Sequence, residues 1–172
     1  MTTTKAARIA LGALLLTIYS TLWVIREITN AMRQRGMLIP AVGAAFALAA
    51  LVVIALLIRN PALRKPKTLL LVAAAGAIYA LVVWPMESPE EKLHFIEYGI
   101  VGVLWFLSLP DAWSTPKRYV TAALATVASG WLDEGIQALI PTRYYDLRDV
   151  GFNALAGLMA LTVFTVARAL AK

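Results

Sequence analysis

Two short polar segments, residues 90–99 and 132–157, carry nearly every side chain of this apolar chain that is capable of acid–base or ionic chemistry. An ionisable side chain inside a membrane-spanning segment is costly, so it usually faces a protein interior and serves a function. The two segments therefore indicate where the protein acts. The candidate residues within them are His94, Glu97, Asp133, Glu134, Gln137, Arg143, Asp149 and Asn153.

In the first segment, His94, Glu97 and Tyr98 are three and four positions apart and share one face of a helix. If a reaction is catalysed, His94 or Glu97 is its general acid or base. The alternative for Glu97 is a structural hydrogen bond that joins two helices. For His94, the only histidine, the functional and structural interpretations are equally supported.

The second segment begins on a helix that carries Thr126, Ser129, Asp133 and Gln137 as a continuous polar stripe. Glu134 lies about 100° around that helix from Asp133. Both carboxylates can therefore face the protein only if the pair straddles a seam between neighbouring helices. Small polar residues on such a stripe also serve as contacts between membrane helices.

Arg143 lies in the link that follows this helix, and two interpretations of it are equally supported. It is either the ion-pair partner of Asp133 or Glu134 at the rim, or a clamp for a phosphate or carboxylate ligand. In the second interpretation Asp133 and Asp149 orient the reacting groups.

The last predicted helix has a polar stripe of its own. Asp146 is expected to cap its start. Asp149, Asn153 and Gly157 are spaced four positions apart, so they lie on one face. We expect that face to point to the shared interior, with Gly157 allowing close helix packing.

Composition sets the class of protein that holds these residues. With 60% hydrophobic and 15% charged residues and a mean hydropathy of +0.74, the chain is predicted to be an all-α, polytopic membrane protein. The net charge of +6 does not indicate nucleic-acid binding, because the basic residues stand at the ends of apolar spans. The absence of cysteine excludes disulfides and thiolate chemistry. Glu91 and His94 form a Glu-x-x-His pair, but we expect neither a metal nor a cofactor.

Six apolar segments approach the roughly 20 residues that a helix needs to cross the hydrocarbon core. They are residues 7–26, 37–58, 68–85, 89–109, 117–140 and 149–170. We expect the first to be a retained span, because no small-residue cleavage site follows it. Ser88 and Glu91 form a capping box around Pro89, which predicts a helix start. The links are short, so residues 1–172 are predicted to form a single membrane domain, with three N-terminal spans in 1–87 and a three-helix core in 88–172.

The distribution of Lys and Arg predicts cytoplasmic termini. Ten basic residues fall in the terminal segments and in two links, at Lys5, Arg8, Arg59, Arg64, Lys65, Lys67, Lys117, Arg118, Arg168 and Lys172. Six fall in the opposite loops, at Arg26, Arg33, Arg35, Lys92, Arg143 and Arg148. Most acidic residues lie in the opposite half, so the candidate site is expected to face outward.

The order of the motifs EKLHFIEYG, DExxQ, PxR and DVxxNxxxG resembles the VanZ-like family of small bacterial membrane proteins. The resemblance covers about residues 90–160. The matching positions are Lys92, His94, Phe95, Tyr98, Asp133, Glu134, Gln137, Pro141, Arg143, Asp149, Val150, Asn153 and Gly157. It implies a bacterial cytoplasmic membrane location and a link to the cell envelope and glycopeptide-antibiotic tolerance. It supplies no established reaction.

Two functions follow as hypotheses. In the first, the site binds or acts on a polar envelope molecule, such as a lipid headgroup or a lipid-linked cell-wall precursor. His94, Glu97 and Asp133 are then the candidate catalytic residues. The candidate ligand-binding residues are Lys92, Tyr98, Glu134, Gln137, Arg143, Asp149 and Asn153. In the second, the chain is a non-catalytic accessory subunit with membrane-protein partners, and its polar cluster locks helices together.

Overall fold

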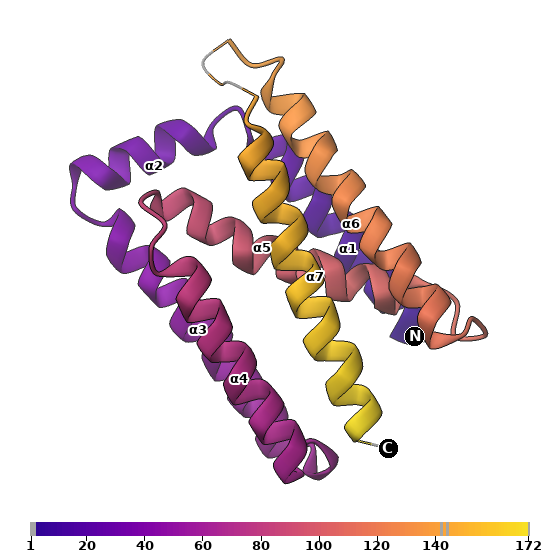
Figure 1. The fold of residues 1–172 in the computed structure, drawn as a ribbon. Helices are drawn as coiled ribbons and strands as arrows, with labels where there is room; N and C mark the ends of the chain where they lie inside the picture. Colours follow the sequence, from indigo (N-terminus) through magenta and orange to yellow (C-terminus); the bar gives the residue numbers. More distant parts are fainter. Residues whose placement is uncertain (1–2, 142, 144, 172) are drawn as a thin grey trace.

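The computed structural model describes residues 3–141, 143 and 145–171. These residues form helices only, and the part of the chain that is described contains no strand, so the predicted all-α class is confirmed (Figure 1). The elements in order are α1 (Thr3–Thr21), α2 (Ile25–Gln34), α3 (Leu38–Arg59), the 3-10 turn η1 (Pro61–Arg64), α4 (Pro66–Val83), α5 (Pro89–Ser108), α6 (Thr115–Gln137) and α7 (Leu147–Leu170).

Among the described residues, three helices, α3, α4 and α7, are each long and apolar enough to cross a membrane. The number rises to four if α1 and α2, which meet at a bend of 71°, form one broken span. Each of the six predicted spans corresponds to a helix, but α5 and α6 do not meet this test and α1 meets it only together with α2. The first turn of α5 carries Glu90 and Glu91, followed by Lys92, and α6 carries Asp133 and Glu134 near its end.

Helix α2 was not expected, because its residues were assigned to a loop. Its residues are mostly polar, so a search for apolar spans does not recognise it as a helix. Thr29 is buried on one side, whereas Val24 and Ile28 beside it are exposed. Gly36, with φ of 66°, follows the helix in the left-handed conformation that commonly ends helices.

Local sequence fixes where the helices of the site begin. The Ser88 hydroxyl accepts a hydrogen bond from the Glu91 amide at 3.4 Å, as the capping box predicts. The second hydrogen bond differs from the one that a capping box predicts. The Ser88 hydroxyl donates to the carboxylate of Glu90 at 3.1 Å. Asp146 caps α7 by accepting from the Arg148 amide at 2.8 Å, which confirms its predicted role.

Glycines allow α5, α6 and α7 to approach closely. A Cβ atom on Gly102 of α5 would lie 2.8 Å from the carbonyl oxygen of Gly157 on α7. A Cβ on Gly157 would lie 2.3 Å from the Thr126 methyl group of α6 and 3.2 Å from the Tyr98 carbonyl oxygen. The predicted close contact at Gly157 is therefore confirmed, and it brings the polar stripes of three helices together.

The apolar surface lies mainly on α3 and α4, which η1 joins at the edge of the molecule (Figure 1). Only 6% of the most apolar window of α3 and 11% of that of α4 is buried. Leu48, Leu51 and Ile58 on α3 and Leu70 and Leu81 on α4 are all exposed. Side chains of this kind are stable against lipid tails but not against water.

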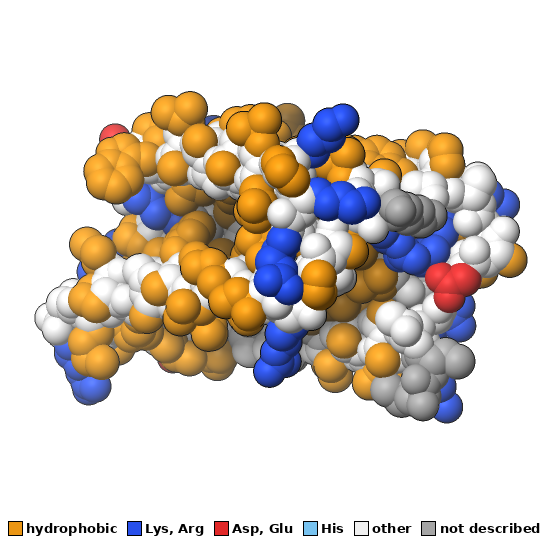
Figure 2. All heavy atoms as spheres, turned by 90° about the horizontal axis from the view of Figure 1, so that it is seen from below, with side chains coloured by type: hydrophobic (Ala, Val, Ile, Leu, Met, Phe, Trp, Pro, Cys, Tyr) orange, Lys and Arg blue, Asp and Glu red, His pale blue; other side chains and the backbone are white. Residues whose placement is uncertain are grey.

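The helices have two distinct ends. At one, which we call the termini end, Lys65, which directly follows η1, donates to the Leu170 carbonyl oxygen at 2.9 Å, and Thr4 of α1 donates to Asp111 at 3.0 Å. Figure 2 views this end and shows Lys and Arg side chains among apolar ones, with few acidic groups. The opposite end, which we call the site end, holds α2, the link from α4 to α5 and the link from α6 to α7 (Figure 1).

A buried arginine joins the helices at the termini end. Arg118 of α6 is 5% exposed, although the sequence indicated only a loop cation. It donates to the Asp111 carboxylate at 3.0 Å and to the Phe106 carbonyl oxygen at 2.9 Å. Its guanidinium also lies 4.4 Å from the centre of the Phe106 ring. The cation thus has a carboxylate, a carbonyl and a ring face as partners.

Candidate functional site

The candidate site is built on two carboxylates at the site end of α6. Asp133 and Glu134 are both fully buried. Asp133 accepts a hydrogen bond from the Tyr98 hydroxyl of α5 at 2.9 Å. Glu134 accepts from the backbone amide of Asp146, just before α7, at 3.3 Å. The neighbouring carboxylates therefore straddle the seam, one facing α5 and the other the start of α7.

Gln137, one turn further along α6, connects these carboxylates to Arg143. Its amide nitrogen donates to Glu134 at 2.8 Å and to Asp133 at 3.3 Å. Its amide oxygen accepts from the Nε atom of Arg143 at 2.8 Å and also from Nη2. Because a carboxylate only accepts and a guanidinium only donates, this orientation of the amide satisfies both sides. Gln137 thus places a neutral group between the anions and the cation.

Of the two interpretations of Arg143, the ion pair with Asp133 or Glu134 does not form in the described chain. Among the residues that the structure describes, the guanidinium of Arg143 donates hydrogen bonds only to the amide oxygen of Gln137. Its side chain is half-buried at the rim. The geometry therefore favours the interpretation in which this guanidinium is available to a ligand.

The α5 side of the site differs from the sequence prediction. Tyr98, which is fully buried, is the residue that contacts Asp133. His94 instead lies beside Glu97, with its Nδ1 atom 3.7 Å from the carboxylate, and this buried nitrogen has no hydrogen-bond partner. Glu97 remains partly exposed, with 42% of its side chain accessible. Neither His94 nor Glu97 hydrogen-bonds to the buried carboxylates.

On α7, Asn153 is fully buried, yet neither its amide nitrogen nor its oxygen has a hydrogen-bond partner in the described chain. It packs against Gly130 of α6, where an added Cβ would lie 3.0 Å from the Asn153 Cβ. Asp149, one turn before it, is half-buried and lies within electrostatic range of His94, Arg143 and Arg148. A buried amide without a partner has a cost that a ligand or ordered water would remove.

Three aromatic residues that sequence reasoning missed complete the network. Tyr19 of α1 donates to the Ser129 carbonyl oxygen at 3.0 Å, and the indole of Trp105 donates to the Ser129 hydroxyl at 3.1 Å. Tyr79 of α4 donates to the Ala156 carbonyl oxygen of α7 at 3.1 Å. Each is a polar-tipped aromatic residue within an apolar segment, where a buried hydroxyl or indole NH usually needs a hydrogen-bond partner, and that need was the available signal.

A pocket of about 470 Å³ lies between the end of α4, the start of α5 and the start of α7. Glu91 and Arg148 line it, but they form no ion pair with each other in the described chain. Lys92, the remaining predicted residue, is half-buried; its backbone amide donates to the Ser88 carbonyl oxygen at 3.3 Å, and its side chain has no hydrogen bond to any residue that the structure describes. The residues that line the pocket come from α4, α5, the link between them and α7, so it lies beside the network on α6 and shares no lining residue with it.

The charges of the site end are not balanced internally. Among the described residues, the two buried carboxylates accept hydrogen bonds only from neutral donors, and the Arg143 guanidinium at the rim donates only to a neutral amide oxygen, with Asp149 within its electrostatic range. Within the described residues, no group of three or more His, Cys, Asp or Glu side chains has the arrangement of a metal site. A buried carboxylate without a cation keeps a proton or attracts a positively charged partner. The arrangement is thus suited to holding a ligand that carries charge.

Comparison with known proteins adds no relative: no protein-family model, curated protein or solved structure matches this chain. The resemblance to the VanZ-like family therefore rests on the motif order and remains a prediction.

Proposed function

We propose that this chain is a multi-pass protein of the bacterial cytoplasmic membrane and that its site end binds the polar part of an envelope amphiphile. Both termini would lie in the cytoplasm and the site would face outward. The amphiphile would be a phospholipid or a lipid-linked cell-wall precursor, in keeping with the VanZ-like resemblance.

The observation that carries this proposal is the position of Arg143. Its guanidinium is held in place by Gln137, and among the described residues it forms no ion pair with a carboxylate. A guanidinium stays protonated and offers a planar fork that fits phosphate or carboxylate oxygens. Fixed in this way at the rim, Arg143 would bind the anionic group of an amphiphile that approaches from the membrane.

A catalytic step would need a proton carrier near that anionic group. The unpartnered Nδ1 atom of His94 is the candidate general acid or base, with Glu97 beside it. Asp133 would act indirectly, by positioning Tyr98 and Gln137. No serine or cysteine nucleophile belongs to the motifs, so the proposal is for binding first and for acid–base chemistry second.

A separate observation supports the alternative in which the polar cluster only joins helices, which we call the structural-lock hypothesis. The bond from Tyr98 to Asp133 joins α5 to α6, and the bond from Asp146 to Glu134 joins the start of α7 to α6. A lock of this kind would serve an accessory subunit with membrane-protein partners. It does not account for a rim cation without a counter-charge, and binding of an amphiphile does.

The proposed orientation is tested by labelling single engineered cysteines, which is direct because the chain has none. Arg64→Cys at η1 should react with a membrane-permeant reagent only, and Tyr145→Cys should also react with an impermeant reagent added to intact cells. Both positions lie outside the long helices. Labelling of the Tyr145 variant exclusively from inside would contradict an outward-facing site.

The proposed binding is tested by native mass spectrometry of the full chain released from detergent, followed by extraction of co-purified lipid. We expect wild type and Arg59→Gln to retain an amphiphile and Arg143→Gln to lose it. Arg59 is a matched control because it is an exposed arginine at the end of α3. Equal retention by all three proteins would remove the basis of the proposal.

A further inference from the structure

The pocket between α4, α5 and α7 has the chemistry of one particular headgroup. We infer that it binds a phosphate ester next to a primary ammonium group, which is the phosphoethanolamine headgroup of a phospholipid. This inference rests on the proposed function, because it names the class of amphiphile that the site end would bind.

The phosphate partner is Arg148. It lines the pocket, and its guanidinium lies 5.8 Å from the centre of the Phe152 ring. Among the described residues it makes no ion pair, because its hydrogen bond to Asp146 comes from the backbone amide. A guanidinium that lies near a ring face and forms no ion pair is suited to a bidentate contact with phosphate.

The ammonium partners are Glu87 and Glu91, whose carboxylates belong to the same pocket. Glu91 lies within electrostatic range of Arg148, but the two do not meet. The pocket thus holds a cation and anions apart, as a zwitterionic headgroup requires. A primary ammonium group donates three hydrogen bonds, whereas the quaternary ammonium of choline donates none.

The apolar part of the pocket comes from Val82 and Met86 at the end of α4 and from Phe152. Beside them, Leu81 and Trp84 are 75% and 85% exposed. Tryptophan at the end of a membrane helix prefers the level of the headgroups. The pocket therefore adjoins a lipid-facing surface along which acyl chains would pass, and its volume of about 470 Å³ is in the usual range for small-molecule sites.

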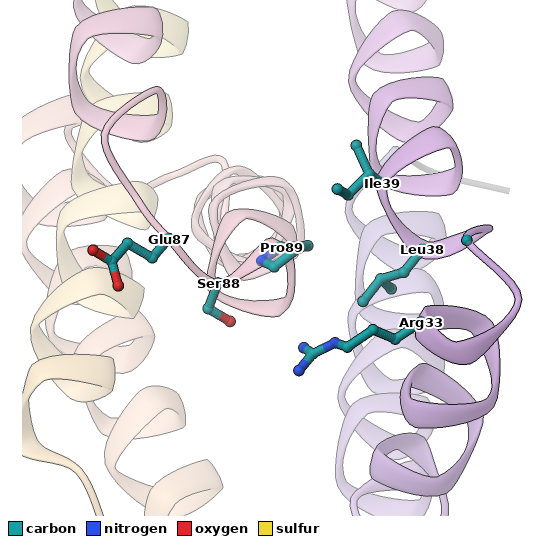
Figure 3. A pocket seen from close by; sticks show the side chains of 7 residues that line it. Arg33, Leu38, Ile39, Glu87, Ser88 and Pro89 are labelled. Carbon is teal, nitrogen blue, oxygen red and sulfur yellow. The ribbon is translucent and has the colours of Figure 1, made fainter.

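A neighbouring pocket on the other side of the link from α4 to α5 provides a contrast. It has a volume of about 510 Å³ and is lined by Arg33, Leu38, Ile39, Glu87 and Ser88, among others (Figure 3). There the guanidinium of Arg33 forms an ion pair with Glu90 at 2.6 Å. Figure 3 also shows the Glu87 side chain pointing away from Arg33. Because its cation is already paired, this pocket is the weaker phosphate site, and Arg33 is the matched control for Arg148.

The test is a competition in which purified full-length protein in detergent receives equal amounts of phosphatidylethanolamine, phosphatidylglycerol and phosphatidylcholine. Native mass spectrometry then measures the fraction of protein that carries each lipid. Wild type should favour phosphatidylethanolamine. Arg148→Gln should reduce binding of all three about tenfold, the effect of losing one charge-assisted contact, and Arg33→Gln should not. Glu91→Gln should abolish the preference for phosphatidylethanolamine over phosphatidylcholine.

A further arm adds glycerophosphoethanolamine, which is the headgroup without acyl chains. Displacement of the lipid at equal concentration would show that the pocket takes the free headgroup, and no displacement would show that it needs the lipid. Melting curves of all variants confirm that they are folded. Preference for phosphatidylglycerol in wild type, or equal binding by Arg148→Gln and Arg33→Gln, would overturn the inference.

The proposed function and this inference fail in different ways. If Arg143→Gln releases a co-purified amphiphile and Arg148→Gln releases nothing, the site end binds an amphiphile that is not recognised in this pocket. The proposed function then stands and the inference falls. If neither variant changes what the protein retains, both are wrong.

Discussion

Arg118 and Arg143 occupy opposite ends of the same helical core, and their partners differ in kind. Arg118 is buried and meets the carboxylate of Asp111 together with a carbonyl oxygen and a ring. Arg143 lies at the rim and meets only the neutral amide of Gln137. In the part of the chain that the structure describes, Arg118 forms an ion pair and Arg143 forms none.

The difference separates a structural contact from a binding site. At the termini end, the partners of Arg118 come from α5 and from the link that follows it, so the ion pair holds elements together. At the site end, Gln137 keeps a guanidinium apart from two buried carboxylates that have no cation of their own. Charges left unbalanced in this way lower stability unless an external partner completes them.

The largest loss of stability is expected from Arg118→Gln, by about 2–4 kcal/mol, because two hydrogen bonds and a cation–π contact are lost. Unfolding in mixed detergent micelles, followed by tryptophan fluorescence, measures it. Arg168→Gln is the control, since Arg168 is exposed on α7. Equal stability of the two variants would show that Arg118 is not a lock.

Tyr98→Phe comes next, with an expected loss of about 1–2 kcal/mol, because the buried Asp133 carboxylate loses its shortest hydrogen bond. The same unfolding assay applies, and Tyr119→Phe is the control because its hydroxyl bonds to Thr162 in an exposed position. A loss no greater than that of the control would mean that the bond from α5 to α6 does not stabilise the fold.

Asp133→Asn is expected to change stability by less than about 1 kcal/mol, because neutralising a buried carboxylate that has no cation offsets the hydrogen bond it loses. Retention of amphiphile should fall, since Gln137 loses one of its anchors. Unfolding and native mass spectrometry are run on the same preparation. Destabilisation as large as that of Arg118→Gln would reveal a counter-charge for Asp133.

The smallest effect on stability, below about 0.5 kcal/mol, is expected from Arg143→Lys, since the residue is at the rim. Lysine keeps the charge but lacks the planar fork, so the lipid fraction measured by native mass spectrometry should fall. Arg59→Lys, on the exposed end of α3, controls for loss of an arginine. Full retention by Arg143→Lys would favour the structural-lock hypothesis.

Features that depend on local sequence were predicted well. Ser88 and Pro89 start α5, Asp146 caps α7, and the apolar runs form helices, because caps and hydrophobic length act through neighbours in the chain. The short helix α2 was missed, because its ten residues are too few and too polar to be recognised as a membrane span. The close approach at Gly157 was also predicted, because a glycine at the end of a polar stripe has few other uses.

Partners across helices could not be predicted in the same way. His94 lies one turn before Tyr98 and Glu97 directly before it, and the packing of α5 decides that Tyr98 is the one that reaches Asp133. The sequence also gave no reason to separate Arg118 from the exposed basic residues of its link. Burial of that guanidinium depends on how α5 and α6 pack around it.

The sequence by itself determined an all-helical chain, its apolar lengths and the two segments that gather its ionisable groups, because hydrophobic length, capping and helical periodicity are local properties. Only the tertiary structure decided that Gln137 stands between the carboxylates and Arg143, and that Glu91 and Arg148 line one pocket without pairing. Those relations depend on how α5, α6 and α7 cross. Glycine contacts between residues far apart in the chain fix the distances between these helices to within a few ångströms.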